Sequence, residues 1–235
     1  MECGPHTSTG TALRDARAAS YETARPDLQA HVPREACRIL DLGCASGALG
    51  AALKRRQIAT VVGVERSAEL AMEAMNVLDR VVVGDIDVVL ANADLAEDPF
   101  DCLIAGDVLE HLVDPWRALA HATSLLAPSG TAVVSIPNVA YFRGLLRLAR
   151  TGRWPLDDTG VFDRTHLRWF TLDDGLDLLR QAGLRATDVE PRYWATGWHL
   201  AWRRLAARTP AHRFLAPQYI FTAVKDRSLV AGACS

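Results

Sequence analysis

The sequence predicts an α/β protein built on a single doubly wound sheet of seven strands, mostly parallel with an antiparallel last strand, and with helices on both faces. Short apolar or β-branched runs alternate with segments of helical periodicity along most of the chain. A glycine turn, Gly43 to Gly47, joins the first apolar run to the helix that follows it. Polar or glycine residues follow four of these runs. In an open parallel sheet the ligand binds at the carboxyl ends of the strands, so residues in these positions are expected at one ligand site.

The first half of the chain alternates strand and helix. Ile39, Leu40 and Leu42 form a short apolar run. Leu49, Ala52 and Leu53 recur at helical spacing after the glycine turn. Residues 88–95 fit either a short helix or an irregular loop. The further elements predicted here are strands at 60–64, 80–83, 101–105 and 131–136, helices at 68–78 and 116–126, and a turn at 128–130.

The two ends of the chain follow other patterns. A helical pattern runs from residue 11 to near Pro26, and Pro33 ends a second short helical piece at 27–32. Thr171 is the expected N-cap of a helix at 172–182, with Asp174 as a partial capping box. The last elements predicted are strands at 184–191 and 218–224, which form an antiparallel hairpin joined by a tryptophan-rich helical insert.

Length and composition are those of one globular domain. The chain has 235 residues, of which 49% are hydrophobic and 23% charged. The five cysteines are odd in number and form no Cys-x-x-Cys pair, so neither a disulfide framework nor a zinc site is expected. We expect a disordered tail at residues 1–10 and one domain at 11–235, divided into an N-terminal helical cap at 11–36, a first half at 37–138 and a second half at 139–225.

Charge and hydropathy argue against two kinds of partner. The formal net charge of −2 gives no basic surplus for a phosphate backbone, so no nucleic acid is expected. No apolar run approaches the ~20 residues that a membrane helix needs, so no membrane insertion is expected. The first residues lack a basic stretch followed by an apolar one, and the cytoplasm is the expected compartment.

The glycine turn has the residues of a ligand site. Free N–H groups and a positive dipole end make the first turn of a helix a good place for polar or anionic groups. The stretch resembles the first motif of class I S-adenosylmethionine-dependent methyltransferases, with Asp41, Gly43 and Gly47 at matching positions. It departs from that motif at Ala45, where the family usually has its middle glycine, and we expect a slightly crowded, more weakly bound cofactor there. From the glycines alone, an ordinary strand-turn-helix corner is the alternative.

This resemblance implies a Rossmann-like sheet, S-adenosylmethionine as the cofactor and S-adenosylhomocysteine as the product. Residues 37–138 would then bind the cofactor and residues 139–225 the acceptor. Glu65 ends the second predicted strand about 20 residues after the glycine turn, where an acid holds a ribose diol. Arg66 follows it and is a further candidate contact.

Two more strand ends are expected at the cofactor. In the family, an acid after the third strand accepts from the adenine amine and the next apolar residue packs on the ring, which assigns these roles to Asp85 and Ile86. Asp85 is alternatively a simple turn residue. Gly106 and Asp107 open the segment after the fourth strand and are expected at the methionine end.

The helical cap holds two more candidates. In the family, the helix before the first strand often lays an aromatic and a basic side chain over the cofactor, and Tyr21 and Arg25 are the residues here that match. Ordinary surface positions are the alternative for both.

Two histidines are candidates for a general base. His111 follows the fourth strand and His166 lies before the helix at 172, so both can reach the predicted ligand edge. A metal-assisted alternative is open, since Asp107, Glu110 and His111 with the distant His166 resemble the divalent-metal set of small-RNA 3′-end methyltransferases and of some quinone-precursor O-methyltransferases. A divalent metal is not the favoured interpretation.

The second half is expected to choose the acceptor. The candidate acceptor-binding residues are Asn138, Tyr141, Arg143 and Trp169. An amphipathic segment at 141–154 interleaves leucines with arginines and is either a lid over the substrate or a packing helix with a solvated arginine face.

The sequence thus predicts methyl transfer to an oxygen or nitrogen of a small or medium organic acceptor by an enzyme similar to quinone-precursor O-methyltransferases. A small-molecule acceptor is the expected partner, and a homodimer is a further option. The alternative is a non-catalytic accessory protein that acts through a partner enzyme, because the stretch 135–138 also resembles accessory proteins of methionine biosynthesis. A dehydrogenase ranks third because the three-glycine dinucleotide fingerprint is absent.

Overall fold

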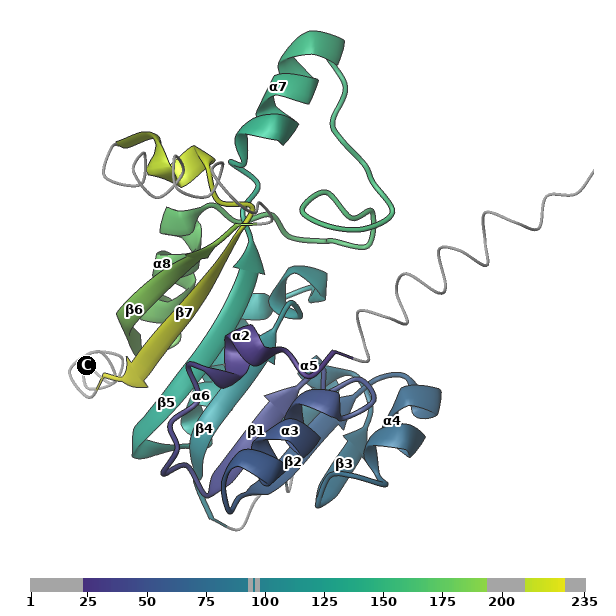
Figure 1. Ribbon diagram of the computed structural model, residues 1–235, viewed down its shortest axis with the longest axis vertical. Helices are drawn as coiled ribbons and strands as arrows, with labels where there is room; N and C mark the ends of the chain where they lie inside the picture. Colours follow the sequence, from purple (N-terminus) through teal and green to yellow (C-terminus); the bar gives the residue numbers. More distant parts are fainter. Residues whose placement is uncertain (1–22, 93–94, 96–97, 194–209, 227–235) are drawn as a thin grey trace, which may run out of the picture.

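The computed structural model describes residues 23–92, 95, 98–193 and 210–226 (Figure 1). Its centre is one seven-stranded sheet in the order β3-β2-β1-β4-β5-β7-β6. β7 runs antiparallel to both of its neighbours, β5 and β6, whereas the pairs among β1 to β5 are parallel. The predicted fold class is confirmed, including the antiparallel last strand.

The elements have the following bounds. The strands are β1 (Arg38–Leu42), β2 (Thr60–Glu65), β3 (Arg80–Val83), β4 (Phe100–Gly106), β5 (Leu126–Pro137), β6 (Leu184–Arg192) and β7 (Gln218–Lys225). The helices are α2 (Pro26–Gln29), α3 (Ala48–Arg56), α4 (Ala68–Ala74), α5 (Ile86–Asn92), α6 (Pro115–Ser124), α7 (Phe142–Thr151) and α8 (Leu172–Gln181), with short 3-10 turns η1 (Leu109–His111) and η2 (Pro210–Phe214).

Both faces of the sheet are covered by helices, because both sides of the central strands are apolar. Leu40 and Leu42 of β1 belong to a core with α5, α6 and α8 on one face. Ile39 points to the other face and packs with Leu28 of α2 and with α3. Alternation of side chains along a strand accounts for this division.

Three elements differ from the sequence prediction. Residues 128–130, predicted as a turn, lie inside β5, and a register shift against β4 between Phe100 and Cys102 accommodates them. Residues 88–92 of the ambiguous 88–95 segment belong to helix α5, which begins earlier, at Ile86. α4 ends at Ala74, four residues earlier than predicted, and the turn after it places Leu78 in the core.

Several other predictions hold. The capping box of α8 is complete, with Asp174 N–H donating to Thr171 Oγ1 and Thr171 N–H donating to the Asp174 carboxylate. Cys44 and Cys102 are buried, free cysteines. Among the described helices, none is long and apolar enough to span a membrane.

Some predictions fall outside the described residues. These are the tail at 1–10, the helical pattern from residue 11, Tyr21, and the tryptophans at 194, 198 and 202. The domain boundaries stay predictions.

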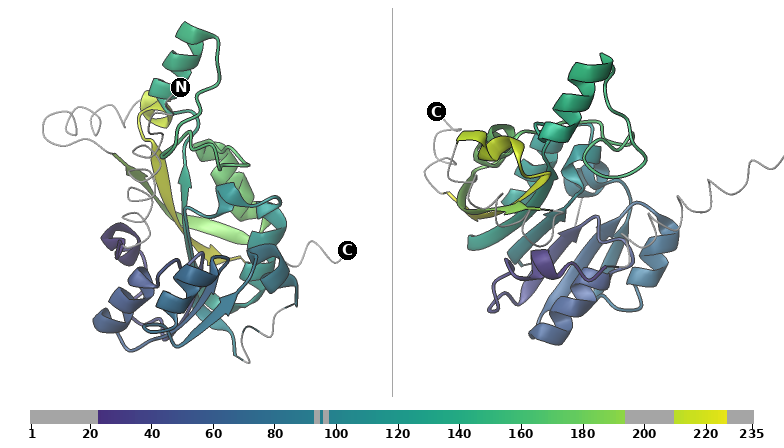
Figure 2. Two further views of the ribbon diagram at one scale, coloured as in Figure 1. Left: turned by 90° about the vertical axis from the view of Figure 1, so that its right-hand side faces the viewer. Right: turned by 45° about the horizontal axis from the view of Figure 1, so that its top comes forward.

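Helix α7 stands apart from the sheet. In Figure 1 it rises above the carboxyl end of β5, and both views of Figure 2 show it projecting from the body of the protein. The chain returns from it through a long loop that ends at α8. The predicted amphipathic segment is therefore a helix on a protruding arm.

Candidate active site

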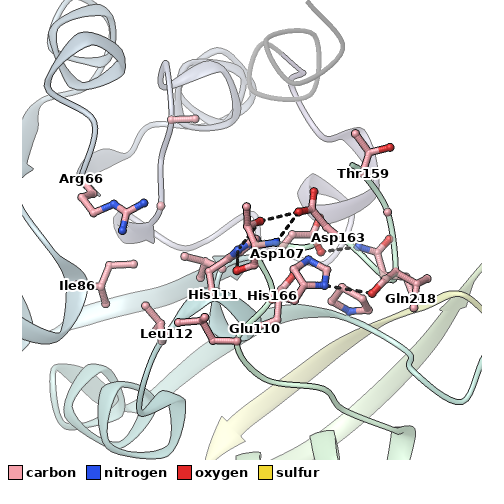
Figure 3. Close-up of a pocket in the computed structure, with 18 of the residues that line it drawn as sticks. Arg66, Ile86, Asp107, Glu110, His111, Leu112, Thr159, Asp163, His166 and Gln218 are labelled. Carbon is pink, nitrogen blue, oxygen red and sulfur yellow. Dashed lines mark hydrogen bonds and ion pairs between the residues drawn. The ribbon is translucent and has the colours of Figure 1, made fainter. Parts of the chain in front are cut away.

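A cavity of about 1110 Å³ opens at the carboxyl ends of β1, β2, β3 and β4 (Figure 3). Arg66 and Ile86 lie at one end of it, and His166 and Gln218 lie at the other. Eleven of the predicted site residues line this cavity: Arg25, Gly43, Ala45, Glu65, Arg66, Asp85, Ile86, Asp107, Glu110, His111 and His166. The convergence of four strand ends that the sequence predicts is present in three dimensions.

Three residues of the glycine turn after β1 have a left-handed backbone conformation. Gly43 and Gly47 have φ of 70° and 81°, and Ala45 between them has φ of 48°. A left-handed backbone costs an L residue about 1–2 kcal/mol. The cost of alanine at this position therefore lies in its backbone, in addition to any crowding of a cofactor by its methyl group.

The glycines of the site make room for protein neighbours. A Cβ on Gly43 would lie 2.9 Å from Val108 Cγ2, and one on Gly47 would lie 2.8 Å from Val77 Cγ2. A Cβ on Gly106 would lie 2.7 Å from Leu28 Cδ1 of α2. Gly106, expected to face the cofactor, instead allows α2 to pack on β4, and neither Gly106 nor Gly47 lines the cavity.

Glu65 is fixed by backbone donors on both oxygens. Ala45 N–H donates to Oε2 at 3.0 Å, and Ser67 N–H donates to Oε1 at 2.7 Å. Asp85 is held in a similar way by the Asp87 N–H at 3.0 Å. Carboxylates oriented by the backbone keep their remaining lone pairs aimed at the cavity.

Asp41 lies just beneath the glycine turn. It is buried, and no hydrogen-bond partner for its Oδ2 is found among the residues described. Burial raises the pKa of Asp41 to about 7, with Arg25 lowering that pKa and Glu65 raising it. A buried carboxyl of this kind gains stabilisation from a nearby cation.

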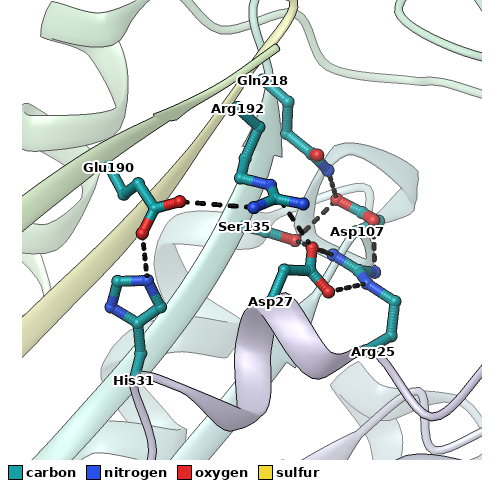
Figure 4. A network of polar contacts seen from close by, with 8 residues as sticks. All are labelled: Arg25, Asp27, His31, Asp107, Ser135, Glu190, Arg192 and Gln218. Atoms are coloured by element: carbon teal, nitrogen blue, oxygen red, sulfur yellow. Dashed lines mark hydrogen bonds and ion pairs between the residues drawn. The ribbon is translucent and has the colours of Figure 1, made fainter. Parts of the chain in front are cut away.

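Asp107 is the centre of a polar network (Figure 4). It has a left-handed φ of 56°, which is rare for a residue with a side chain. Its carboxylate accepts from Arg25 Nη1 at 2.7 Å, from Ser135 Oγ at 2.6 Å and from Gln218 Nε2. These donors engage both oxygens of the Asp107 carboxylate.

The network continues across the sheet to α2 and β6. Arg25 Nε donates to Asp27 Oδ1 at 3.1 Å, and Arg192 Nε lies 3.7 Å from Asp27 Oδ2. Arg192 also pairs with Glu190 at 3.3 Å. Sequence reasoning missed Asp27, Arg192 and Gln218, because no local pattern marks residues brought in from distant elements.

The two candidate bases are neighbours. The rings of His111 and His166 lie 4.8 Å apart in an edge-to-face arrangement. His166 Nδ1 is 3.1 Å from the Val161 carbonyl oxygen, so that nitrogen donates and Nε2 keeps its lone pair. Burial, and then His111, lower the pKa of His166, which keeps its imidazole neutral.

Glu110 lies beside this pair. It is buried, and neither of its carboxylate oxygens has a hydrogen-bond partner in the described part of the chain. Burial raises its pKa well above the ordinary value, with Asp107 adding to the effect. Its Oε1 lies 3.9 Å from His166 Nε2, and one ligand atom each from Glu110, His111 and His166 lie within 4.8 Å of one another.

The four candidate acceptor residues lie outside the cavity lining. Asn138 is fully buried and donates to the carbonyls of Arg213 and Ala216, so it ties two chain segments together. Tyr141 is buried in a small apolar cluster, and Arg143 is exposed on α7. Trp169 packs its ring 5.5 Å from that of His166 and thus contacts the site indirectly.

The chain was also compared with known proteins. A family model described as "Methyltransferase domain" matches residues 13–189. A "Ubiquinone biosynthesis O-methyltransferase" from Ruegeria pomeroyi is 32% identical over 168 residues, which cover 69% of this chain and 65% of that protein. A protein of the same description from Cereibacter sphaeroides is 27% identical over 190 residues, covering 77% of this chain and 74% of the relative.

Solved structures show the same fold. A possible histamine N-methyltransferase from Thermotoga maritima superposes with a TM-score of 0.63 at 19% identity, covering 94% of this chain and 96% of that one. The magnesium protoporphyrin IX methyltransferase of Synechocystis, solved with bound S-adenosylhomocysteine, has a TM-score of 0.57 at 17% identity, covering 96% and 90%. The chain therefore belongs to the class I S-adenosylmethionine-dependent methyltransferases.

Proposed function

We propose that this protein transfers the methyl group of S-adenosylmethionine to a hydroxyl oxygen of a small organic acceptor. The observation that carries the proposal is that one cavity is lined both by the cofactor-type strand ends and by the histidine pair. A volume of about 1110 Å³ suits a cofactor together with a compact acceptor.

The cofactor roles follow from the side chains along one wall. Glu65 binds the ribose hydroxyls with the lone pairs that Ala45 and Ser67 leave open. Asp85 accepts from the adenine amine while Ile86 packs on the ring. The positive sulfonium and amino group lie towards Asp41 and Asp107, whose carboxylates stabilise them.

The histidines act on the acceptor. The acceptor oxygen attacks the methyl carbon, the carbon–sulfur bond breaks with its electron pair staying on sulfur, and neutral S-adenosylhomocysteine leaves. His166 Nε2 takes the hydroxyl proton, since its Nδ1 already donates to Val161. His111, whose Nδ1 is 3.2 Å from the Thr165 carbonyl oxygen, orients the acceptor or substitutes as base.

Oxygen is favoured over nitrogen as the methylated atom. The two relatives above are named O-methyltransferases, and they match at 32% and 27% identity. The Thermotoga neighbour named for N-methylation is only 19% identical. This support comes from the names of relatives, so both atoms are tested below.

A metal-assisted reaction is the second candidate function, and the position of the Glu110 carboxylate beside the histidine pair favours it. A buried carboxylate with two unpartnered oxygens beside two imidazoles fits a divalent ion such as Mg²⁺ or Mn²⁺. The ion would polarise the acceptor oxygen. Asp107, part of the set expected from the sequence, does not join it, since Arg25, Ser135 and Gln218 occupy its oxygens.

The test is turnover of a panel of phenols and amines by the purified protein, before and after dialysis against EDTA. Base catalysis predicts methylated product in both cases. Loss of turnover on dialysis and its recovery with Mg²⁺ would move the assignment to the metal-assisted reaction. Binding of S-adenosylhomocysteine without turnover of any acceptor would favour the accessory-protein alternative.

A further inference from the structure

Helix α7 and the residues after it form a projecting lobe, defined here as residues 142–156 (Figures 1 and 2). It meets the rest of the protein at Gly144 and at Trp154, whose ring packs edge-to-face on Phe162 at 5.8 Å and on Trp169 at 5.3 Å. A Cβ at Gly144 would lie 1.9 Å from Phe162 Cζ, so the ring packs directly on the helix backbone. Gly152, with a left-handed φ of 65°, ends the helix.

One side of this helix is an uncovered apolar stripe. Phe142, Leu145, Leu146 and Ala149 recur at helical spacing and share one face. Phe142, Leu145 and Leu146 are 37%, 39% and 42% exposed, and Trp154 and Leu156, beyond the end of the helix, are partly exposed as well. Single exposed leucines are ordinary on a protein surface, whereas a contiguous stripe marks an interaction site.

The adjoining side of the helix is basic. Residues 142–154 contain four arginines, Arg143, Arg147, Arg150 and Arg153, and no acidic residue, although the whole chain has a net charge of −2. Arg147 pairs with Asp157 at 2.6 Å. The other three have no acidic partner among the described residues, so the lobe has a local positive charge.

We propose that this lobe docks the protein on the surface of an anionic lipid bilayer. α7 would lie in the plane of the interface, with the apolar stripe at the boundary of the acyl chains and the arginines on the lipid phosphates. The two features together select a bilayer over other polyanions. A nucleic acid or an acidic protein segment would bind the arginines but would not bury the leucine stripe, whereas a bilayer does both.

The docking is peripheral, because none of the described helices is able to cross a membrane. The loop that returns from the lobe lines the cavity with Thr159, Val161 and His166. A docked lobe therefore brings one wall of the cavity near the lipid surface. The inference does not depend on the proposed methyl transfer, since it uses residues outside the cavity.

Sedimentation of the full-length protein with vesicles tests the proposal. Vesicles of phosphatidylcholine with a phosphatidylglycerol fraction should bind the protein, and pure phosphatidylcholine vesicles should bind it weakly. The double variant Arg150→Ser/Arg153→Ser should lower the partition coefficient about 25-fold, from about fivefold for each arginine near the surface. Leu145→Ser/Leu146→Ser should lower it by at least about tenfold, and added salt should weaken binding of the wild type.

Matched controls are available on the other side of the molecule. Arg55→Ser on α3 and Met72→Ser on α4 change an exposed arginine and an exposed apolar residue, and both should bind vesicles as the wild type does. All variants should keep the wild-type affinity for S-adenosylhomocysteine, which shows that they are folded.

Equal partitioning to neutral and anionic vesicles would overturn the proposal. The proposal would also be overturned if Leu145→Ser/Leu146→Ser bound anionic vesicles as the wild type does and a soluble polyanion bound the protein equally well. That result would show that the arginines bind any polyanion without the apolar stripe. A third result would also overturn it: the wild type binds no vesicles and forms a dimer, and Leu145→Ser/Leu146→Ser is a monomer. The apolar stripe would then be an interface with a second copy of the chain.

Discussion

The backbone N–H of Ala45 donates a 3.0 Å hydrogen bond to the carboxylate of Glu65. This bond joins the glycine turn after β1 to the tip of β2, so the two motifs that we propose bind the cofactor are directly connected. It forms because Ala45 adopts a left-handed φ of 48°, which points its N–H towards β2.

Replacing Ala45 with glycine should stabilise the protein. Glycine adopts positive φ without steric cost, and the gain in the free energy of unfolding should be about 1 kcal/mol after the greater flexibility of the unfolded chain is counted. Urea denaturation measures it. Affinity for S-adenosylhomocysteine should change less than about threefold, since the hydrogen bond to Glu65 is kept. A variant of lower stability would show that the alanine backbone is not strained.

Replacing Glu65 with glutamine should weaken S-adenosylhomocysteine binding by about 10- to 100-fold, the range for losing hydrogen bonds to a charged group. Isothermal titration calorimetry gives the affinity. Glu69→Gln, on the exposed surface of α4, is the matched control and should bind as the wild type does. Equal affinities for both variants would remove Glu65 from the ribose site.

Asp41 predicts a pH dependence of stability. Burial raises its pKa in the folded protein to about 7, whereas the unfolded chain has the ordinary value near 4. Between these values the folded protein holds a proton that the unfolded chain has released, so the contribution of Asp41 to the free energy of unfolding falls as pH rises from 4 to 7.

Asp41→Asn removes that dependence. The free energy of unfolding of Asp41→Asn, minus that of the wild type, should increase by up to about 4 kcal/mol between pH 4 and pH 7. Each pH unit in this window contributes about 1.4 kcal/mol. Urea denaturation at several pH values checks it, with exposed Asp98→Asn as the control. A constant difference between wild type and Asp41→Asn from pH 4 to pH 7 would contradict the raised pKa.

Gly144→Ala should displace Phe162, because a Cβ there would meet the ring at 1.9 Å. Overpacking of this kind costs about 1–3 kcal/mol. Phe162 belongs to the loop that carries His166, so turnover should fall while S-adenosylhomocysteine affinity stays unchanged. Phe162→Leu in the same chain should restore turnover in part. If Phe162→Leu does not restore turnover although the protein is folded, the packing of Phe162 on Gly144 does not affect the histidine site.

The sequence predicts the strands and the residues that line the cavity at their carboxyl ends well, because both depend on local patterns. β3 has its predicted bounds, and Gly43, Glu65 and Asp85 lie at one cavity as expected. β5 was predicted too short, since Pro128 and Gly130 have the residue types of a turn. They lie in the irregular stretch of β5 between the pairs Leu126–Phe100 and Thr131–Cys102, and the sequence does not show that the strand continues through it.

The acceptor side was harder to predict. The direction of the Asp107 side chain depends on its left-handed backbone and on Arg25 and Gln218, which are 82 and 111 positions away. Asn138, a candidate acceptor-binding residue from the sequence, is buried and donates to the carbonyls of Arg213 and Ala216. Such long-range partners leave no local signal in the sequence.

The most direct test of the account is methyl transfer by the purified wild-type protein and by His166→Gln, measured as S-adenosylhomocysteine release together with mass analysis of a phenolic acceptor. We expect the wild type to give one added methyl group on oxygen. His166→Gln should bind S-adenosylhomocysteine normally and turn over about 10²- to 10⁴-fold more slowly, the range for loss of a general base. A wild-type protein that binds neither the cofactor nor its product, or a His166→Gln variant with full activity, would contradict the account.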